Sequence, residues 1–153
     1  SDVWPQMTTS EQEARKGWMS ILAIASPARL ADLVPALPVH DLLRAPEAGA
    51  VMVQGRFGGT GAAFNLGEMT VTRCSVRLAD GAVGHAWVQG RDKGHAVRAA
   101  VVDALMQTGS AAEVADRILA PLAAEAQAER ARRTQKAAET KVEFFTMVRG
   151  EDQ

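Results

Sequence analysis

The stretch from Ala82 to Met106 constrains the fold most, because it reads as a strand, a glycine turn and a helix in direct succession. The Asp80-Gly81 pair before it is typical of a tight β-hairpin. Gly90 breaks the strand, and Asp92 can cap a helix that starts near Lys93. This helix is rich in alanine, so we expect it to lie close against a sheet.

The strand before the Asp80-Gly81 pair predicts a hairpin with two distinct faces. Met69 to Ala79 is rich in Thr and Val, and it pairs antiparallel with Ala82 to Gln89 if Asp80 and Gly81 are the two loop residues. In that register the core side consists of Cys74, Val76 and Leu78 opposite Trp87, His85 and Val83. We therefore expect His85 to be a satisfied core histidine.

The other side of this hairpin carries Arg73 and Arg77. In the same register the residues across from this side are Gly84, Ala86 and Val88. Such a shelf of small residues would leave room for another molecule, so both arginines are candidate partner-interface residues. An ordinary solvent-exposed strand face is an equally good interpretation.

Two helices are expected before the sheet. Apolar spacing over residues 9–24 predicts the first, and Ser10 with Glu13 three residues later matches a capping box. Ser26 followed by Pro27 begins a second helix in the segment to Leu37, and Pro35 and Pro38 are expected to end it.

Two more strands are predicted over residues 39–46 and 49–57, with residues 45–49 as the turn between them. Together with the hairpin they indicate an α+β fold. We expect an antiparallel sheet of about four strands, with helices on one face and a long helical C-terminal extension.

Three parts follow from these elements. Residues 1–8 are expected to be a flexible lead, and residues 9–110 the α+β core domain. Residues 111–153 are expected to be a helical extension with an aromatic tail, within the same domain. Pro121 should kink this extension or start a new helix.

The aromatic tail is unusual, because chain ends are commonly polar and frayed. Residues 125–141 are mostly alanine and charge, so this helix should protrude or lie on a partner. The apolar side chains of the tail are Phe144, Phe145 and Met147. We expect them to pack on the domain's own core or on a partner chain.

Composition excludes several classes of protein. With 153 residues, 47% of them hydrophobic, the chain fits one domain with a real core. A formal net charge of −1 argues against a nucleic-acid or anionic-membrane partner. The single cysteine, Cys74, rules out an internal disulfide and thiolate metal clusters, and fits a reducing cytoplasm. No apolar run or leader indicates a membrane span or export.

Two glycine turns are candidate anion sites. The loop over residues 55–61 offers backbone N–H groups beside Arg56, although Ala62 and Ala63 stand where a P-loop needs Lys and Ser or Thr. A flexible hairpin connection is the alternative. The turn over residues 90–93 has Arg91 and Lys93 at a helix start, although a capping Asp92 would occupy the free N–H groups itself.

Other side chains leave the chemistry open. Asp103 in the central helix is either a general base or the buried partner of an arginine. His85 and His95 have no acidic or histidine neighbours at metal-ligand spacing, and His40 is far away in sequence, so no metal site is expected.

Several motifs in order resemble one family, the G subunit (PhnG) of the carbon-phosphorus lyase system. The resemblance covers about residues 15 to 150 and is specific because it rests on separate motifs. These are Gly17-Trp18-Met19-Ser20, Arg56-Phe57-Gly58-Gly59-Thr60-Gly61, Thr72-Arg73, Trp87 with Gly90-Arg91-Asp92-Lys93-Gly94-His95-Ala96, Asp103-Ala104-Leu105-Met106-Gln107 and Phe144-Phe145-Thr146-Met147-Val148-Arg149-Gly150.

The resemblance implies a bacterial, cytoplasmic protein of phosphonate breakdown. In that family the G subunit assembles with the H, I and J subunits into a core complex with two copies of each. With the I subunit, and with H and L required, it takes part in making α-D-ribose 1-methylphosphonate 5-triphosphate from ATP and methylphosphonate, with release of adenine. ATP and methylphosphonate are then substrates of the complex, and no cofactor is expected on this subunit.

The resemblance carries over no catalytic residue. Our hypothesis for anion or substrate contact consists of Arg56, Gly58, Gly59, Arg91, Lys93 and His95. Our hypothesis for the partner interface consists of Arg73, Arg77, Phe144, Phe145, Met147 and Arg149. The alternative function is a free-standing phosphate-binding domain without catalysis, and the isolated chain is either a monomer or a homo-oligomer.

Overall fold

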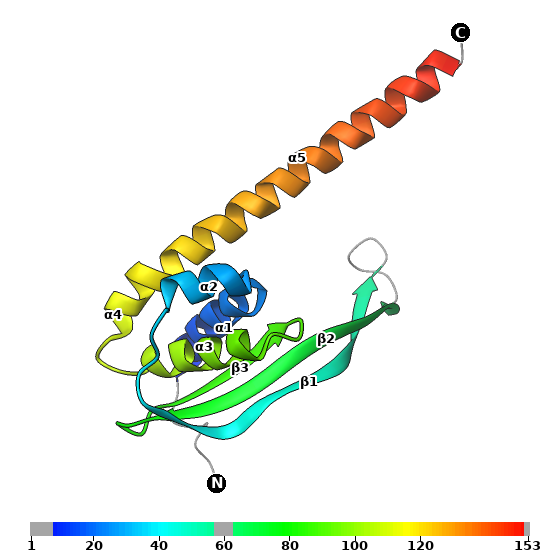
Figure 1. Cartoon of the computed structure of the whole chain (residues 1–153). Coiled ribbons are helices and arrows are strands. Elements are labelled where there is room, and N and C mark those ends of the chain that lie inside the picture. The colour runs from blue at the N-terminus through cyan, green and yellow to red at the C-terminus, as the bar shows by residue number, and fades with distance from the viewer. Residues whose placement is uncertain (1–7, 57–62, 152–153) are drawn as a thin grey trace.

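The computed structural model describes residues 8–56 and 63–151, and it is an α+β structure with a sheet on one side and helices on the other (Figure 1). The predicted fold class is confirmed, with three strands in place of about four. The elements in chain order are α1 (Thr9–Ile24), α2 (Pro27–Leu33), β1 (His40–Arg56), β2 (Ala63–Leu78), β3 (Val83–Gln89), α3 (Lys93–Leu105), α4 (Ala111–Val114), the π-helical turn η3 (Ala115–Leu119) and α5 (Ala120–Glu151).

The sheet has the order β1-β2-β3, and both pairs are antiparallel. The two strands predicted over residues 39–46 and 49–57 are one strand, β1, and the predicted turn between them is wrong. Arg44 pairs with Ser75 and Glu47 pairs with Arg73, so two residues of β1 lie opposite one residue of β2. This bulge absorbs Pro46, whose missing N–H is tolerated because β1 is an edge strand.

The β2–β3 hairpin is confirmed, but its predicted register is off by one residue. Arg77 pairs with Val83, and the loop has three residues instead of two. The Leu78 N–H donates to the Ala82 carbonyl at 2.8 Å, and Gly81 has φ of +95°. Within this loop only Gly81 has a positive φ, as a type I turn followed by a bulge requires. The predicted two-residue turn would need two such residues.

This shift exchanges the two faces of β3. Gly84, Ala86 and Val88 are buried under the helices, whereas His85 and Trp87 lie on the outer face. The prediction of His85 as a core histidine is therefore wrong. Arg73 and Arg77 are on the outer face as predicted, but they stand opposite Trp87 and Val83 instead of small residues.

The small residues of β3 have another role, because they let α3 approach. A Cβ on Gly84 would lie 1.9 Å from the Ala100 carbonyl oxygen of α3. Ala96, Ala99, Ala100 and Ala104 are all buried on this helix. The predicted close contact between the alanine-rich helix and the sheet is confirmed.

Helices α1 and α2 complete the layer over the sheet (Figure 1). Helix α1 has the predicted bounds, but its cap is Thr8, whose hydroxyl accepts from the Glu11 N–H at 3.1 Å, and not Ser10. Ser26 caps α2 as predicted. This helix ends at Leu33, before the first of the two prolines expected to end it, because Pro35 disfavours helical backbone in the residue before it.

The C-terminal region begins with α4, the π-helical turn η3 and then α5. The π-helical turn ends just before Pro121, where an extra residue in the turn accommodates the ring and the missing N–H. Helix α5 then runs for 32 residues and projects away from the rest of the molecule (Figure 1). The predicted protruding helix is confirmed, and no helix among the described residues is long and apolar enough to cross a membrane.

Candidate functional site

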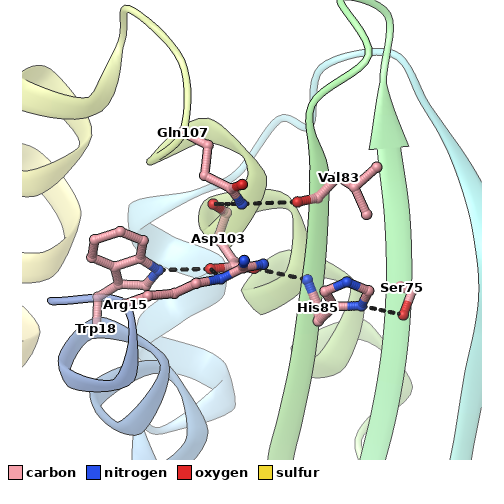
Figure 2. A network of polar contacts seen from close by, with 7 residues as sticks. All are labelled: Arg15, Trp18, Ser75, Val83, His85, Asp103 and Gln107. Carbon is pink, nitrogen blue, oxygen red and sulfur yellow. Dashed lines mark hydrogen bonds and ion pairs between the residues drawn. The ribbon is translucent and has the colours of Figure 1, made fainter. Parts of the chain in front are cut away.

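The most connected polar group in the described structure is the carboxylate of Asp103 on α3 (Figure 2). It is fully buried and accepts from Arg15 Nη2 at 2.7 Å and Nε at 3.2 Å. Trp18 Nε1 donates to it at 2.7 Å, and the backbone N–H of His85 donates at 2.8 Å. The carboxylate thus joins α1, α3 and β3.

This network closes part of the free edge of β3. The His85 N–H and the Val83 carbonyl point away from β2, and side chains of the α3 region satisfy both. Asp103 accepts from the first, and Gln107 Nε2 donates to the second at 2.8 Å. A covered edge prevents pairing with a foreign strand at this point.

The two alternatives for Asp103 are thereby decided in favour of the buried arginine partner. Both of its oxygens already accept two hydrogen bonds each, and the side chain has no exposed surface. A general base needs access to a substrate proton, so Asp103 is a structural group in this conformation.

His85 lies on the outer face of the sheet beside this network. Its Nδ1 and the Ser75 hydroxyl are 2.7 Å apart and share a hydrogen bond. Burial lowers the pKa of the His85 imidazole, the Arg15 guanidinium lowers it further, and the Asp103 carboxylate opposes both. A lowered pKa keeps His85 neutral near pH 7.

The predicted anion site at the start of α3 is only partly open. Arg91 and Lys93 are exposed, but the Asp92 carboxylate accepts from the His95 N–H at 2.9 Å and so occupies the helix start. His95 itself is 2% exposed, and its Nε2 donates to the Leu22 carbonyl at 2.8 Å. The two exposed cations are thus the groups that an external anion would meet first.

The other predicted anion site lies elsewhere. Gly58 and Gly59 are outside the described residues, and Arg56 pairs with Ala63 at the end of the β1–β2 ladder. Gly90 donates to the Thr70 carbonyl, and Thr70 pairs with Ala50. Six residues of extended chain, about 20 Å, separate this point from Arg56. Arg56 and the turn over residues 90–93 therefore lie in two separate regions of the sheet and do not form one combined anion site.

The outer face of the sheet has a shallow hollow of about 180 Å³ around Arg73. Its guanidinium lies 3.1 Å from Glu47 and 6.0 Å from the centre of the Trp87 ring, which is 54% exposed. The floor is formed by Gly49, Val51 and Val71. An exposed aromatic ring held by a cation and bordered by a hollow is a surface that a partner can cover.

The tail residues do not pack on the domain's own core. Phe144, Phe145 and Met147 are 61%, 53% and 67% exposed on α5. Of the two expectations for the tail, the structure thus excludes packing on this chain's core. Arg149 lies in the same helix.

Sequence reasoning did not single out Arg15, and it named Trp18 only within a family motif. The signal was present, because Arg15 lies seven residues before Leu22 and thus on the buried face of α1. An arginine on an apolar helix face needs a buried acid as its partner. Asp103 is such an acid, because it lies on the buried face of α3. Among the described residues, no group of three or more His, Cys, Asp or Glu could hold a metal ion.

Comparison with known proteins identifies a family and a similar relative. The family model described as "Phosphonate metabolism protein PhnG" matches residues 13–150. A protein of Rhizobium meliloti (strain 1021), named α-D-ribose 1-methylphosphonate 5-triphosphate synthase subunit PhnG, is 43% identical over 141 residues. That alignment covers 90% of this chain and 90% of the relative.

Proposed function

The chain belongs to the PhnG family of phosphonate metabolism proteins, and we propose that it is a subunit of the synthase that makes α-D-ribose 1-methylphosphonate 5-triphosphate. The observation that carries this proposal is the 43% identity to a named subunit of that synthase over nine tenths of both chains. The reaction would join methylphosphonate to the ribose of ATP and release adenine. The cytoplasm, where ATP is available, is the expected location.

The arrangement of polar groups supports a role within a complex. The buried acid of the network, Asp103, is fully occupied by donors from its own chain. Arg91 and Lys93 are exposed cations, and Asp92, the acid between them, is engaged as the cap of α3. We infer that other subunits supply the catalytic residues and that this subunit positions or helps to bind the anionic substrates.

The uncovered apolar residues support an obligate partner. Phe144 and Met147 are more than half exposed on the projecting part of α5, and Trp87 is 54% exposed on the sheet. Burying an apolar side chain contributes roughly 1.5–3 kcal/mol, so these residues favour association. We propose that the I subunit covers Phe144 and Met147 of the tail and that the H, J and L subunits complete the system.

Reconstitution tests this proposal. We would mix the purified chain with the I subunit, measure the mass of the product by light scattering, and then add H and L and follow adenine release from ATP and methylphosphonate. We expect a stable mixed complex and adenine release that requires this chain. The double variant Phe144→Ser/Met147→Ser should weaken the mixed complex, whereas Glu143→Ser, on the same exposed helix, should not.

The opposite outcome is equally specific. A chain that ignores the I subunit but binds ATP or methylphosphonate on its own would be a free-standing anion-binding domain. Isothermal titration of the isolated chain with each ligand measures this directly. Binding in the isolated chain together with no mixed complex would overturn the subunit proposal.

A further inference from the structure

We propose that α5 pairs antiparallel with α5 of a second copy of this chain. The inference goes beyond the proposed function, because the isolated chain is enough to test it. It concerns the outer side of α5, which is opposite the side that Leu122 buries in the core. The projecting part of the helix leaves this side free along its length (Figure 1).

The outer side carries a seam with the spacing of a coiled coil. Its positions alternate by four and three residues, so they stay on one stripe of the helix. All of the following seam residues are exposed: Ala124, Ala128, Ala131, Gln135, Ala138, Val142 and Phe145. Alanine dominates one half of the seam, and the large apolar residues lie at its other end.

Because of this gradient in size, two antiparallel helices fit together. The large residues of one copy then lie opposite the alanines of the other. In antiparallel pairing with knobs-into-holes layers, Phe145 shares a layer with Ala128 of the second copy. Val142 then meets Ala131, and Gln135 meets Ala138. Each layer combines one larger residue with one alanine, which lets the helices approach closely.

Charges on the flank of the seam select this register. In it, Arg132 of each copy lies beside Glu139 of the other, so one contact of opposite charge forms twice. Sliding the second helix by one heptad in one direction would set Arg132 against Arg132. Sliding it in the other direction would set Glu139 against Glu139. Like charges at these positions disfavour both alternatives.

Parallel pairing is disfavoured by the same residues. It would place Phe145 beside Phe145 and leave three layers of alanine against alanine at the other end of the seam. It would also bring Arg132 beside Gln127 and Glu139 beside Thr134 of the other copy, so the contacts of opposite charge would be lost. The antiparallel arrangement removes the mismatch in size and forms both contacts, and two-fold symmetry closes it at two copies.

Charge reversal tests the register in the full-length chain. Sedimentation velocity should show a dimer for the wild-type chain at concentrations between about 1 and 100 μM. Helix pairs of modest affinity typically dissociate in this range. Arg132→Glu and Glu139→Arg should each raise the dissociation constant by about tenfold or more, since each creates two like-charge contacts. The double variant Arg132→Glu/Glu139→Arg should restore the dimer.

Cross-linking tests the geometry independently. Gln135→Cys lies on the seam next to the two-fold axis, so a short bismaleimide should join two copies. Lys136→Cys is the matched control, because the next residue points to the other side of the helix and should give no dimer. Circular dichroism of each variant shows whether α5 stays helical.

Three results would overturn the proposal. They are a wild-type chain that stays monomeric throughout the concentration range, a double charge variant that fails to recover the dimer while remaining helical, and equal cross-linking at positions 135 and 136. A fourth result would do the same: a dimer that keeps its dissociation constant in all three charge variants forms through another surface.

Discussion

Arg15 and Asp103 lie 88 residues apart in the sequence and form an ion pair of 2.7 Å in the interior of the protein. The Asp103 side chain has no exposed surface, and that of Arg15 is 10% exposed. The same carboxylate binds Trp18 and the backbone of β3. This one acid therefore fixes α1 and the sheet edge relative to α3.

The first prediction concerns this acid. Asp103→Asn would remove the negative charge and leave the Arg15 guanidinium buried without its counter-ion. We expect the free energy of unfolding to fall by about 3–5 kcal/mol, as measured by urea denaturation. Asp116→Asn, at an exposed position on η3, is the control and should change it by less than about 0.5 kcal/mol. A small effect at Asp103 would show that the network contributes little to stability.

Gly84 gives the second prediction. The methyl group of Gly84→Ala would lie 1.9 Å from the Ala100 carbonyl and 2.6 Å from the Ala104 nitrogen, so backbone atoms must move. We expect a loss of about 3 kcal/mol or more in the free energy of unfolding, or failure to fold. Gly109 has open space around it, so Gly109→Ala should leave the free energy of unfolding and the melting temperature nearly unchanged. Thermal melts of the two variants measure this difference. Equal melting temperatures for the two variants would contradict the close contact.

The sequence was sufficient to predict the helices and the β2–β3 hairpin, because these depend on local signals. Caps at Ser26 and Asp92 are contacts within a few residues, and the periodicity of α1 needs no tertiary information. Pro46 was misleading because a proline can end a strand or sit in a bulge at the sheet edge. Only the pairing of β1 with β2 distinguishes these cases.

The register of the hairpin depended on tertiary contact in the same way. Asp80-Gly81 fits a two-residue loop and a three-residue loop equally well in sequence. What selects the longer loop is the need to place Gly84 and Ala86 under α3, and Trp87 outside. The Asp92 cap in the candidate anion turn was predictable from local sequence, whereas the Arg15–Asp103 pair required knowing that α1 packs on α3.

A third prediction uses the lone cysteine. Cys74 is 1% exposed, and burial raises the pKa of its thiol, so little reactive thiolate is accessible. We expect the folded chain to react with a maleimide at least about a hundredfold more slowly than the urea-unfolded chain, because reaction requires opening of the core. Fast labelling of the folded chain, followed by mass spectrometry, would show that this part of the sheet opens readily.

His85 gives a prediction for pH dependence. Its pKa is lowered in the folded protein from a usual value of 6.5, so the unfolded chain binds a proton more readily than the folded chain. Stability from this group is therefore fully present above about pH 6.5, and it is lost as the pH falls below that value and through the lower pKa of the folded protein. Urea denaturation at pH 7 and pH 5 should show a larger loss for the wild-type chain than for His85→Gln.

The control for this pH effect is Gln89→Ala, at an exposed position on β3 that carries no titratable group. This variant should leave the difference between pH 7 and pH 5 close to that of wild type. If His85→Gln and wild type lose the same free energy on acidification, His85 does not carry the pH dependence.

The last prediction separates a substrate role from an interface role for Arg91 and Lys93. Both side chains are exposed, and Asp92 caps α3 without them, so Arg91→Ala and Lys93→Ala should fold normally. If these cations contact phosphate or phosphonate, the assembled complex should keep its mass while KM for ATP or methylphosphonate rises by about tenfold, as expected for one charge-assisted hydrogen bond. Arg117→Ala, an exposed arginine on η3, is the matched control and should change neither quantity. Loss of the mixed complex in either variant would instead make the start of α3 a subunit interface, and unchanged mass and kinetics would remove both residues from the site.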